Sequence, residues 1–268
     1  MRKAVLLAAS ACLIATAPAF AAGDRIYSLF DFGYANTSLN FKGPSNDFSI
    51  NQLHGSGSVL WGWSDNWNAQ ATFGFGTDRF GDTGSKFAVD TWKLGGSAFY
   101  RDQAQGLLGG EISYRSIDVG PYADGLSLMG RGEAYLDDAN VGGYLGYTNL
   151  TSDGVNFDTH GWQLGGYGKY YASPGLGLKL GLDYANYKVA SSGTSDLSLN
   201  GEAEYLLADS NTSLYADLGI GTMGFSGPDA DYWQVGMGVR VHLGGGGSLK
   251  DRNRNEPLQS IQALRVIP

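Results

Sequence analysis

The sequence predicts an all-β chain that closes into a transmembrane, antiparallel up-and-down β-barrel of about 12 strands. Three observations predict it: alternation of apolar with polar or glycine residues, a composition rich in glycine and aromatics, and an export signal. In one segment Leu176, Leu178, Leu180 and Leu182 alternate with Gly177, Lys179, Gly181 and Asp183. Successive strand side chains point to opposite faces, so one face meets hydrocarbon and the other meets water.

The N-terminal segment 1–21 is predicted to be a secretory signal peptide. Arg2 and Lys3 begin it, an apolar run follows, and Ala19 and Ala21 mark the expected cleavage site. Its removal also removes Cys12, the one cysteine of the chain. We therefore expect the exported protein to have no disulfide and to be held by backbone pairing and packing.

The composition favours a barrel with interfacial aromatic girdles. The chain has 42 Gly, 16 Tyr, 12 Phe and 6 Trp against 7 Pro. A glycine-rich disordered chain is the alternative, but such chains are poor in aromatics and do not alternate. No run after the signal is long enough for a membrane helix. With 26 Asp+Glu against 18 Lys+Arg, we expect no nucleic-acid partner.

The barrel domain is expected over residues 22–243. Its strand count is even, and one hairpin fewer or more would give about 10 or about 14 strands. The predicted strands are 28–40, 49–63, 68–77, 89–101, 106–117, 126–136, 141–150, 161–171, 176–187, 197–207, 213–225 and 232–243.

The predicted connections alternate between short turns and longer polar loops. Short turns are expected at 64–66, 102–104, 137–139, 173–175 and 209–211, and longer loops at 42–47, 78–86, 118–124, 151–160, 190–196 and 226–231. Short turns on one rim and long loops on the other are typical of bacterial outer-membrane barrels, and here they predict both termini on the periplasmic side. A soluble β-sandwich would alternate too, but the signal peptide, the aromatics and the scarcity of proline favour the barrel.

Aromatic residues beside the short turns are expected in the periplasmic girdle. They are Trp61, Trp63 and Trp67 at one turn, and Tyr170 and Tyr171 at a later one.

Over residues 24–243 the chain resembles the outer-membrane β-barrel and porin-like proteins of Gram-negative bacteria. The resemblance rests on the signal peptide, the alternation, the girdle and the two kinds of connection. It implies a location in the outer membrane, contact with membrane lipid and lipopolysaccharide, and insertion by the barrel-insertion machinery. Such proteins usually end on a strand with a terminal aromatic, whereas here the last strand ends at His242 and Leu243 and a tail follows. The oligomeric state is left open.

Charged residues of both signs fall on the inward parity of the strands. Either they line a hydrated pore and set its ion preference, or they pair across the lumen and fill it. Inward glycines such as Gly74, Gly181, Gly236 and Gly238 are expected to free space for a narrow pore. The pore-lining candidates are Lys93, Glu111, Arg115, Arg131, Glu133, Lys169, Lys179, Asp183, Glu202, Glu204, Asp217 and Arg240, with His242 beside them.

Enzymatic interpretations find little support in the sequence. His54, His160 and His242 have no evident partner, and the match of residues 219–224 to Gly-x-Gly-x-x-Gly precedes no predicted helix. We expect no catalytic residues, no cofactor and no metal site.

The tail, 244–268, is predicted to be a flexible glycine-rich linker followed by a basic segment. Lys250, Arg252 and Arg254 either contact the anionic inner surface or are solvated, and the solvated interpretation is preferred.

Three functions follow as hypotheses. The first is a narrow passive pore for ions or small polar solutes. The second is a structural or adhesive barrel with a filled lumen that acts through its outer loops, and the third is a lipid hydrolase.

Overall fold

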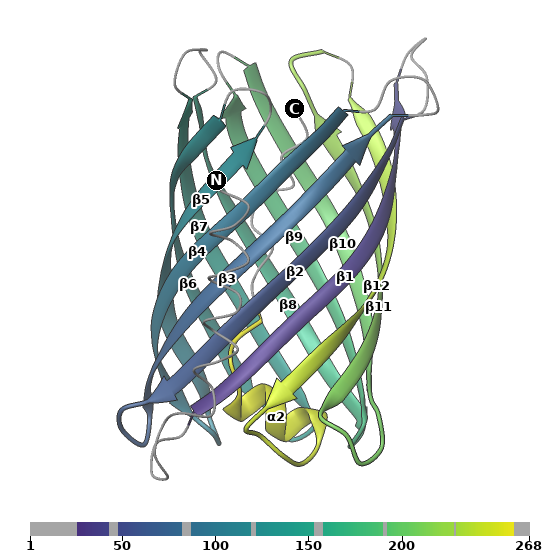
Figure 1. Cartoon of the computed structure of the whole chain (residues 1–268). Helices are drawn as coiled ribbons and strands as arrows, with labels where there is room; N and C mark the ends of the chain where they lie inside the picture. The colour runs from purple at the N-terminus through teal and green to yellow at the C-terminus, as the bar shows by residue number, and fades with distance from the viewer. Residues whose placement is uncertain are drawn as a thin grey trace.

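The structure is a computed structural model that describes residues 26–42, 48–81, 87–118, 122–152, 158–189, 192–227 and 229–259. The predicted signal peptide and residues 260–268 lie outside the described residues. Twelve antiparallel strands form a closed barrel in which each strand pairs with its neighbours in sequence and β12 pairs with β1 (Figure 1). The predicted fold class is confirmed.

Every predicted strand matches an observed strand. Eight predicted ranges lie within the observed strands, and the four predicted to end at Trp63, Leu136, Leu207 and Phe225 end one residue earlier. They are β1 Ile26–Phe41, β2 Phe48–Gly62, β3 Trp67–Phe80, β4 Phe87–Asp102, β5 Gly106–Asp118, β6 Tyr122–Tyr135, β7 Ala139–Ser152, β8 Thr159–Ser173, β9 Leu176–Val189, β10 Ser192–Leu206, β11 Thr212–Gly224 and β12 Ala230–Leu243.

The strands extend mainly toward one rim, which we call the loop end. β5 ends at Asp118 and β6 begins at Tyr122, so the predicted 118–124 loop is largely strand. We call the opposite rim, where β1 begins and β12 ends, the turn end. The expected difference in length between loops and turns is therefore smaller than the sequence suggested, because pairing continues past the expected strand ends.

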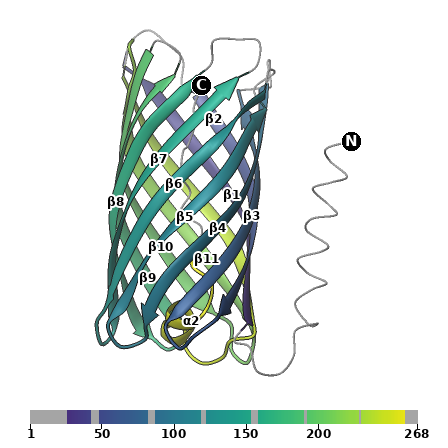
Figure 2. The same ribbon diagram turned by 90° about the vertical axis from the view of Figure 1, so that its left-hand side faces the viewer.

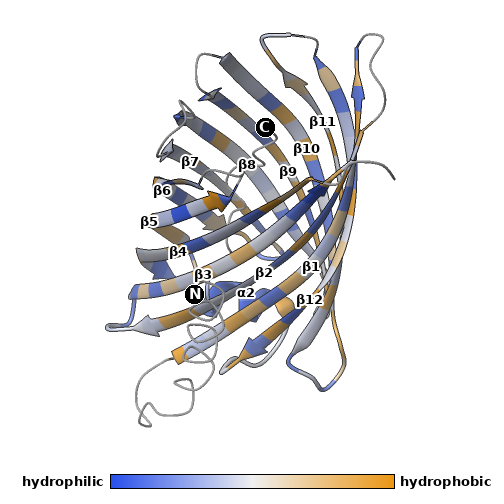
Figure 3. Cartoon of the chain, turned by 45° about the horizontal axis from the view of Figure 1, so that its top comes forward, coloured by the Kyte–Doolittle hydropathy of each residue, from blue (hydrophilic) through white to orange (hydrophobic). Residues whose placement is uncertain are grey.

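The outer face of the barrel is an apolar belt. Leu180 and Leu182 are more than half exposed to the surroundings of the isolated chain, whereas Gly181 between them is buried. The alternation is visible along the strands in Figure 3. An outward apolar band of this kind is what a bilayer covers. Among the described residues, no helix is long and apolar enough to cross a membrane.

Aromatic side chains flank the first short turn on the outside. Trp63 and Trp67 stack with ring centroids 6.2 Å apart, and Tyr100 packs edge-on against Trp67. Trp61 is also exposed, as expected for the girdle. Tyr170 is exposed as well.

The other tyrosine assigned to the girdle does not belong to it. Tyr171 is buried inside the barrel and accepts a hydrogen bond from Asn140. The physical reason is strand parity, because adjacent residues of one strand cannot both face lipid.

Inward apolar side chains form a cluster inside the loop end, which we call the loop-end collar. The alternation predicts that the inner face of each strand meets water, but near the loop end Leu39, Ile50 and Leu150 are almost completely buried. The collar draws on strands β1 to β5, β7, β11 and β12. Its members are Leu39, Ile50, Phe80, Val89, Ile117, Leu150, Met223, Ala230 and Tyr232.

The tail differs from the expected flexible and solvated segment. Residues Leu249–Asn255 form a helix, α2, which lies within the turn end of the barrel (Figures 1 and 2). Ser248 caps the helix, and its side chain accepts a hydrogen bond from the backbone N–H of Asp251. Leu249 and Arg252 are buried. Side chains of the lumen wall provide polar partners for this tail, and the sequence pattern does not reveal them.

Candidate functional site: the lumen and the C-terminal segment

The twelve predicted pore-lining residues share the inner surface of the barrel. Lys93, Arg115, Arg131, Lys179, Asp183, Glu202, Asp217 and Arg240 line one cavity. The other four contact one another or members of this group, as Glu111 does with Lys93, Glu133 with Arg131, and Glu204 with Lys169 and Arg240. Their placement follows from period-two alternation. Their role in conduction stays a prediction.

The cavity has a volume of about 420 Å³ and lies inside the lumen. Charges of both signs, amide side chains and tyrosines line it, so water and polar solutes find partners on its walls. Gln52, Gln163, Asn200, Gln234, Tyr144, Tyr167, Tyr184, Tyr187 and Tyr215 belong to this lining.

The inward glycines do not all leave empty space. A Cβ on Gly74 or Gly181 would have its nearest neighbour at 3.8 Å or 3.5 Å, so these two leave room. A Cβ on Gly238 would lie 2.4 Å from the Tyr215 ring, and one on Gly236 would lie 2.3 Å from the Asp217 carboxylate. At Gly236 and Gly238 the absent side chain makes room for a neighbour, and not for a wider pore.

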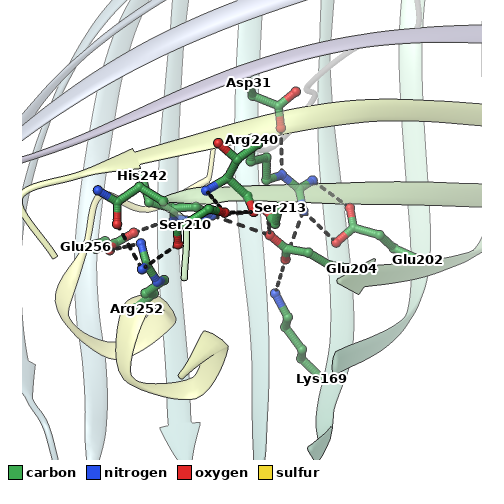
Figure 4. A network of polar contacts seen from close by, with 12 residues as sticks. Asp31, Lys169, Glu202, Glu204, Ser210, Ser213, Arg240, His242, Arg252 and Glu256 are labelled. Carbon is green, nitrogen blue, oxygen red and sulfur yellow. Dashed lines mark hydrogen bonds and ion pairs between the residues drawn. The ribbon is translucent and has the colours of Figure 1, made fainter. Parts of the chain in front are cut away.

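Arg240 of β12 lies among carboxylates of β1, which pairs with β12, and of β10 (Figure 4). Its guanidinium is 2.7 Å from Asp31, 2.7 Å from Glu202 and 3.1 Å from Glu204. Lys169 lies 2.8 Å from Glu204. Three acidic and two basic side chains therefore form one compact ion network on the wall. Taking such groups out of water is costly unless every charge is paired, and here all five are.

Two further ion pairs lie on β4 to β6. Lys93 is 2.5 Å from Glu111, and Arg131 is 3.4 Å from Glu133. Tyr167 donates a hydrogen bond of 2.8 Å to Glu133 and accepts one of 2.9 Å from Arg131. These pairs join charges of opposite sign along the wall, on neighbouring strands or on one strand, and they do not cross the lumen as the second sequence interpretation expected.

Lys179 differs from the paired cations. Its ammonium lies 5.0 Å from the centroid of the Tyr167 ring. Among the described residues no carboxylate lies within ion-pair distance of it. Because Lys179 also lines the cavity, its positive charge acts on the water or solute that occupies the cavity.

The histidines have partners that sequence reasoning missed. Nε2 of His54 lies 3.1 Å from the Tyr215 hydroxyl, and Nδ1 of His242 donates a hydrogen bond of 2.5 Å to Glu256. His160 lies on the outward face of β8, two residues before the exposed Trp162. The partners of the first two come from other strands or from the C-terminal segment, so sequence distance concealed them.

Ser213, His242 and Glu256 form a row with the order of a nucleophile, a base and an acid. Oγ of Ser213 lies 3.1 Å from Nε2 of His242. However, Ser213 donates its hydroxyl hydrogen to Glu204 at 2.7 Å and is completely buried. A nucleophile needs access to substrate and a free proton path to the base. The row therefore serves as a polar contact between the wall and the C-terminal segment.

We call residues 249–259 the C-terminal segment. It contacts the inner wall at positions spread around the turn end. Lys250 contacts Asp138, Arg252 contacts Asn211, Asn253 contacts Glu133, Arg254 contacts Asn140, Asn255 contacts Gln103, Glu256 contacts Arg101 and His242, Leu258 contacts Gln70, and Gln259 contacts Arg131.

The sequence carries one signal for this segment. Ser248 and Asp251 have the spacing of a capping box, and both reciprocal hydrogen bonds are present. The hydrogen bonds from Ser248 hold the pKa of the Asp251 carboxyl below its ordinary value. In the described part of the chain, no group of three or more potential metal ligands gathers.

The solved structures that the chain is similar to are membrane barrels. An outer-membrane channel from Pseudomonas putida F1 has a TM-score of 0.64 and 13% identity, covering 84% of this chain and 97% of that one. The β domain of the Bordetella autotransporter BrkA gives 0.55 and 13%, over 80% and 98%. The translocator domain of NalP from Neisseria meningitidis gives 0.53 and 15%, over 90% and 97%. No family model matches the chain, and no curated protein does.

These likenesses establish the fold. The chain has the closed antiparallel β-barrel architecture of these outer-membrane proteins, with an apolar belt on its outer face.

Proposed function

We propose that the protein is a narrow passive pore for ions or small polar solutes across the outer membrane. The observation that carries the proposal is the cavity of about 420 Å³ inside the lumen, lined by charges of both signs. Such a lining provides hydrated passing solutes with polar partners at little desolvation cost. The similarity to an outer-membrane channel supports the proposal.

The turn end faces the periplasm in this proposal, as short turns do in outer-membrane barrels. Solute then enters through the loop-end collar and leaves beside the C-terminal segment. Lipopolysaccharide and membrane lipid surround the belt, and the barrel-insertion machinery places the chain in the membrane. No catalytic step, cofactor or metal is part of the proposed function.

A structural or adhesive barrel with a filled lumen is the second candidate. The observation in its favour is the C-terminal segment, which lies across the turn end and contacts the wall on several strands. A barrel of this kind acts through its loops, and its lumen conducts nothing.

Planar-bilayer recording of the refolded chain separates the two candidates. The pore predicts current steps whose ion preference shifts toward cations in Arg131→Ala and toward anions in Glu133→Ala. Arg79→Ala is the matched control, because this exposed arginine lies on the outward face of β3 near the loop end. Silence from a chain shown to be folded by heat-modifiable migration, with and without residues 248–268, would contradict the pore.

A further inference from the structure

The chain enters the lumen after β12 through two glycines in left-handed backbone. Gly244 has φ 92° and Gly247 has φ 89°, values at which other residues are strained. A Cβ on Gly244 would also lie 2.5 Å from the carbonyl oxygen of Ile26. The backbone N–H of Leu249 then donates a hydrogen bond of 2.8 Å to the carbonyl of Pro174 in the β8–β9 turn. This linker directs the chain back into the barrel that it has just completed.

The contacts of the C-terminal segment with the wall are almost all polar. Leu249 and Pro257 are its buried apolar side chains among the described residues. Glu256 instead receives hydrogen bonds from His242 and, on its backbone carbonyl, from Arg101 at 2.9 Å. Polar contacts of this kind exchange readily for contacts with water, whereas a hydrophobic interface does not.

Several buried polar atoms around the C-terminal segment are left without a hydrogen-bond partner in the described structure. They include Nε and Nη2 of Arg101 and the hydroxyl of Tyr135. Nη1 of Arg252 and Oε1 of Glu256 also lack one, and these two atoms lie 3.6 Å apart. Because water would satisfy all of these groups, departure of the segment is partly compensated by hydration.

The segment also reaches from the rim into the lumen. Its residue Leu258 exchanges two hydrogen bonds with the side chain of Gln70, at 2.7 Å and 3.0 Å. The carbonyl of Gln259 accepts a hydrogen bond of 3.1 Å from Arg131, and both residues line the cavity. One continuous segment therefore connects the turn-end rim to the proposed solute path.

We propose that the C-terminal segment is a displaceable plug of the lumen. In place, it closes the turn end, and its release opens the passage to the periplasm. The proposal rests on the pore proposed above, and it assigns to this chain its own regulatory element. The plug swings on the glycine linker while the twelve strands stay paired.

Cross-linking tests whether the plug must move. The side chains of Gln103 and Asn255 meet at 2.5 Å on the exposed rim, and the chain without its predicted signal has no cysteine. The variant with Gln103→Cys and Asn255→Cys is joined by a short, cleavable bifunctional thiol reagent. We expect the bilayer current of the double variant to fall to the baseline after cross-linking and to return after cleavage. Gln103→Cys alone, treated in the same way, is the control.

Removal of residues 248–268 is the complementary variant. We expect a steady current larger than the intermittent current of the full chain. Equal currents from the full, truncated and cross-linked chains would overturn the plug while the pore stands. A silent full chain with a conducting truncated chain would overturn displacement, because the segment would then be a permanent closure. Silence from all three would contradict the pore itself.

A second measurement follows the plug without any current. Thr72 is buried, and its hydroxyl accepts a hydrogen bond from Gln70, which also holds Leu258. In Thr72→Cys we expect a water-soluble thiol reagent to react slowly in the cross-linked chain, faster in the full chain and fastest in the truncated chain. The loop end is the same in all three, so the differences report the turn end. One common rate would overturn the plug even if no current is recorded.

Discussion

The two ends of the lumen are narrowed by different chemistry. At the loop end, the collar consists of inward apolar side chains such as Leu39 and Leu150 that belong to the strands themselves. At the turn end, a separate piece of chain crosses the opening and is held by hydrogen bonds and ion pairs, such as that between His242 and Glu256. An apolar cluster resists wetting, and a polar contact competes with water. The first end is therefore a fixed constriction, and the second is suited to opening.

The largest expected effect comes from the ion network that supports the turn end. In Arg240→Ala the carboxylates of Asp31, Glu202 and Glu204 lose their shared cation inside the barrel. We expect the free energy of unfolding to fall by about 3 to 5 kcal/mol. Denaturant titration in lipid vesicles, followed by gel migration, measures it.

Arg79→Ala serves as the control for this comparison, because Arg79 is exposed at the loop end. A midpoint for Arg240→Ala equal to that of the control would show that the network does not stabilise the barrel.

The loop-end collar gives the next largest effect. Leu150 is completely buried, and Leu150→Asn places an amide among apolar side chains, at an expected cost of about 2 kcal/mol. The polar group also admits water, so we expect the bilayer current to rise. Leu150→Ala removes volume without adding polarity. If both variants raised the current equally, the collar would be a steric obstacle and not a dry one.

A smaller effect is expected at the contact between Glu256 and His242. Glu256→Gln keeps the shape of the side chain but removes its charge, and a charge-assisted hydrogen bond exceeds a neutral one by about 1 to 1.5 kcal/mol. The plug should therefore be released about tenfold more often. The labelling rate of Thr72→Cys measures this release. Asp196→Asn, which changes a lumen acid opposite Met223 at the loop end, should leave that rate unchanged.

The smallest effect concerns ion preference alone. Lys179→Gln removes a cation that lines the cavity and lies over Tyr167. We expect the preference for anions to fall about twofold. Reversal potentials in a salt gradient measure the preference. The exposed Lys188 provides the control, and an equal shift in Lys188→Gln would remove Lys179 from the solute path.

The strands could be predicted from sequence because their cause is local. Leu178 and Lys179 face different surroundings whatever the rest of the chain does, so alternation revealed both the strands and their inner faces. The same reasoning gave strands 68–77 and 197–207; the structure extends the first to Trp67–Phe80, and it begins the second at Ser192 and ends it at Leu206. Alternation alone does not identify the inward residues near the loop end that are apolar and form the collar.

The C-terminal segment was not predictable in the same way. Its helix has seven residues and no apolar stripe, and its polar side chains resemble those of a solvated tail. What orders it is a set of partners far away in sequence, such as Asn140 for Arg254 and Gln70 for Leu258. The paired charges have the same origin, because Asp31 and Arg240 meet only when β1 closes on β12.

The proposed pore is closed at the turn end by its own chain and narrowed at the loop end by apolar side chains. Bilayer recording of a chain that lacks residues 248–268, with and without Leu150→Asn, tests both ends together. We predict a steady current from the truncated chain and a larger one when Leu150→Asn is added. A truncated barrel that is folded yet as silent as its Leu150→Asn counterpart would contradict both the pore and its closure by the C-terminal segment.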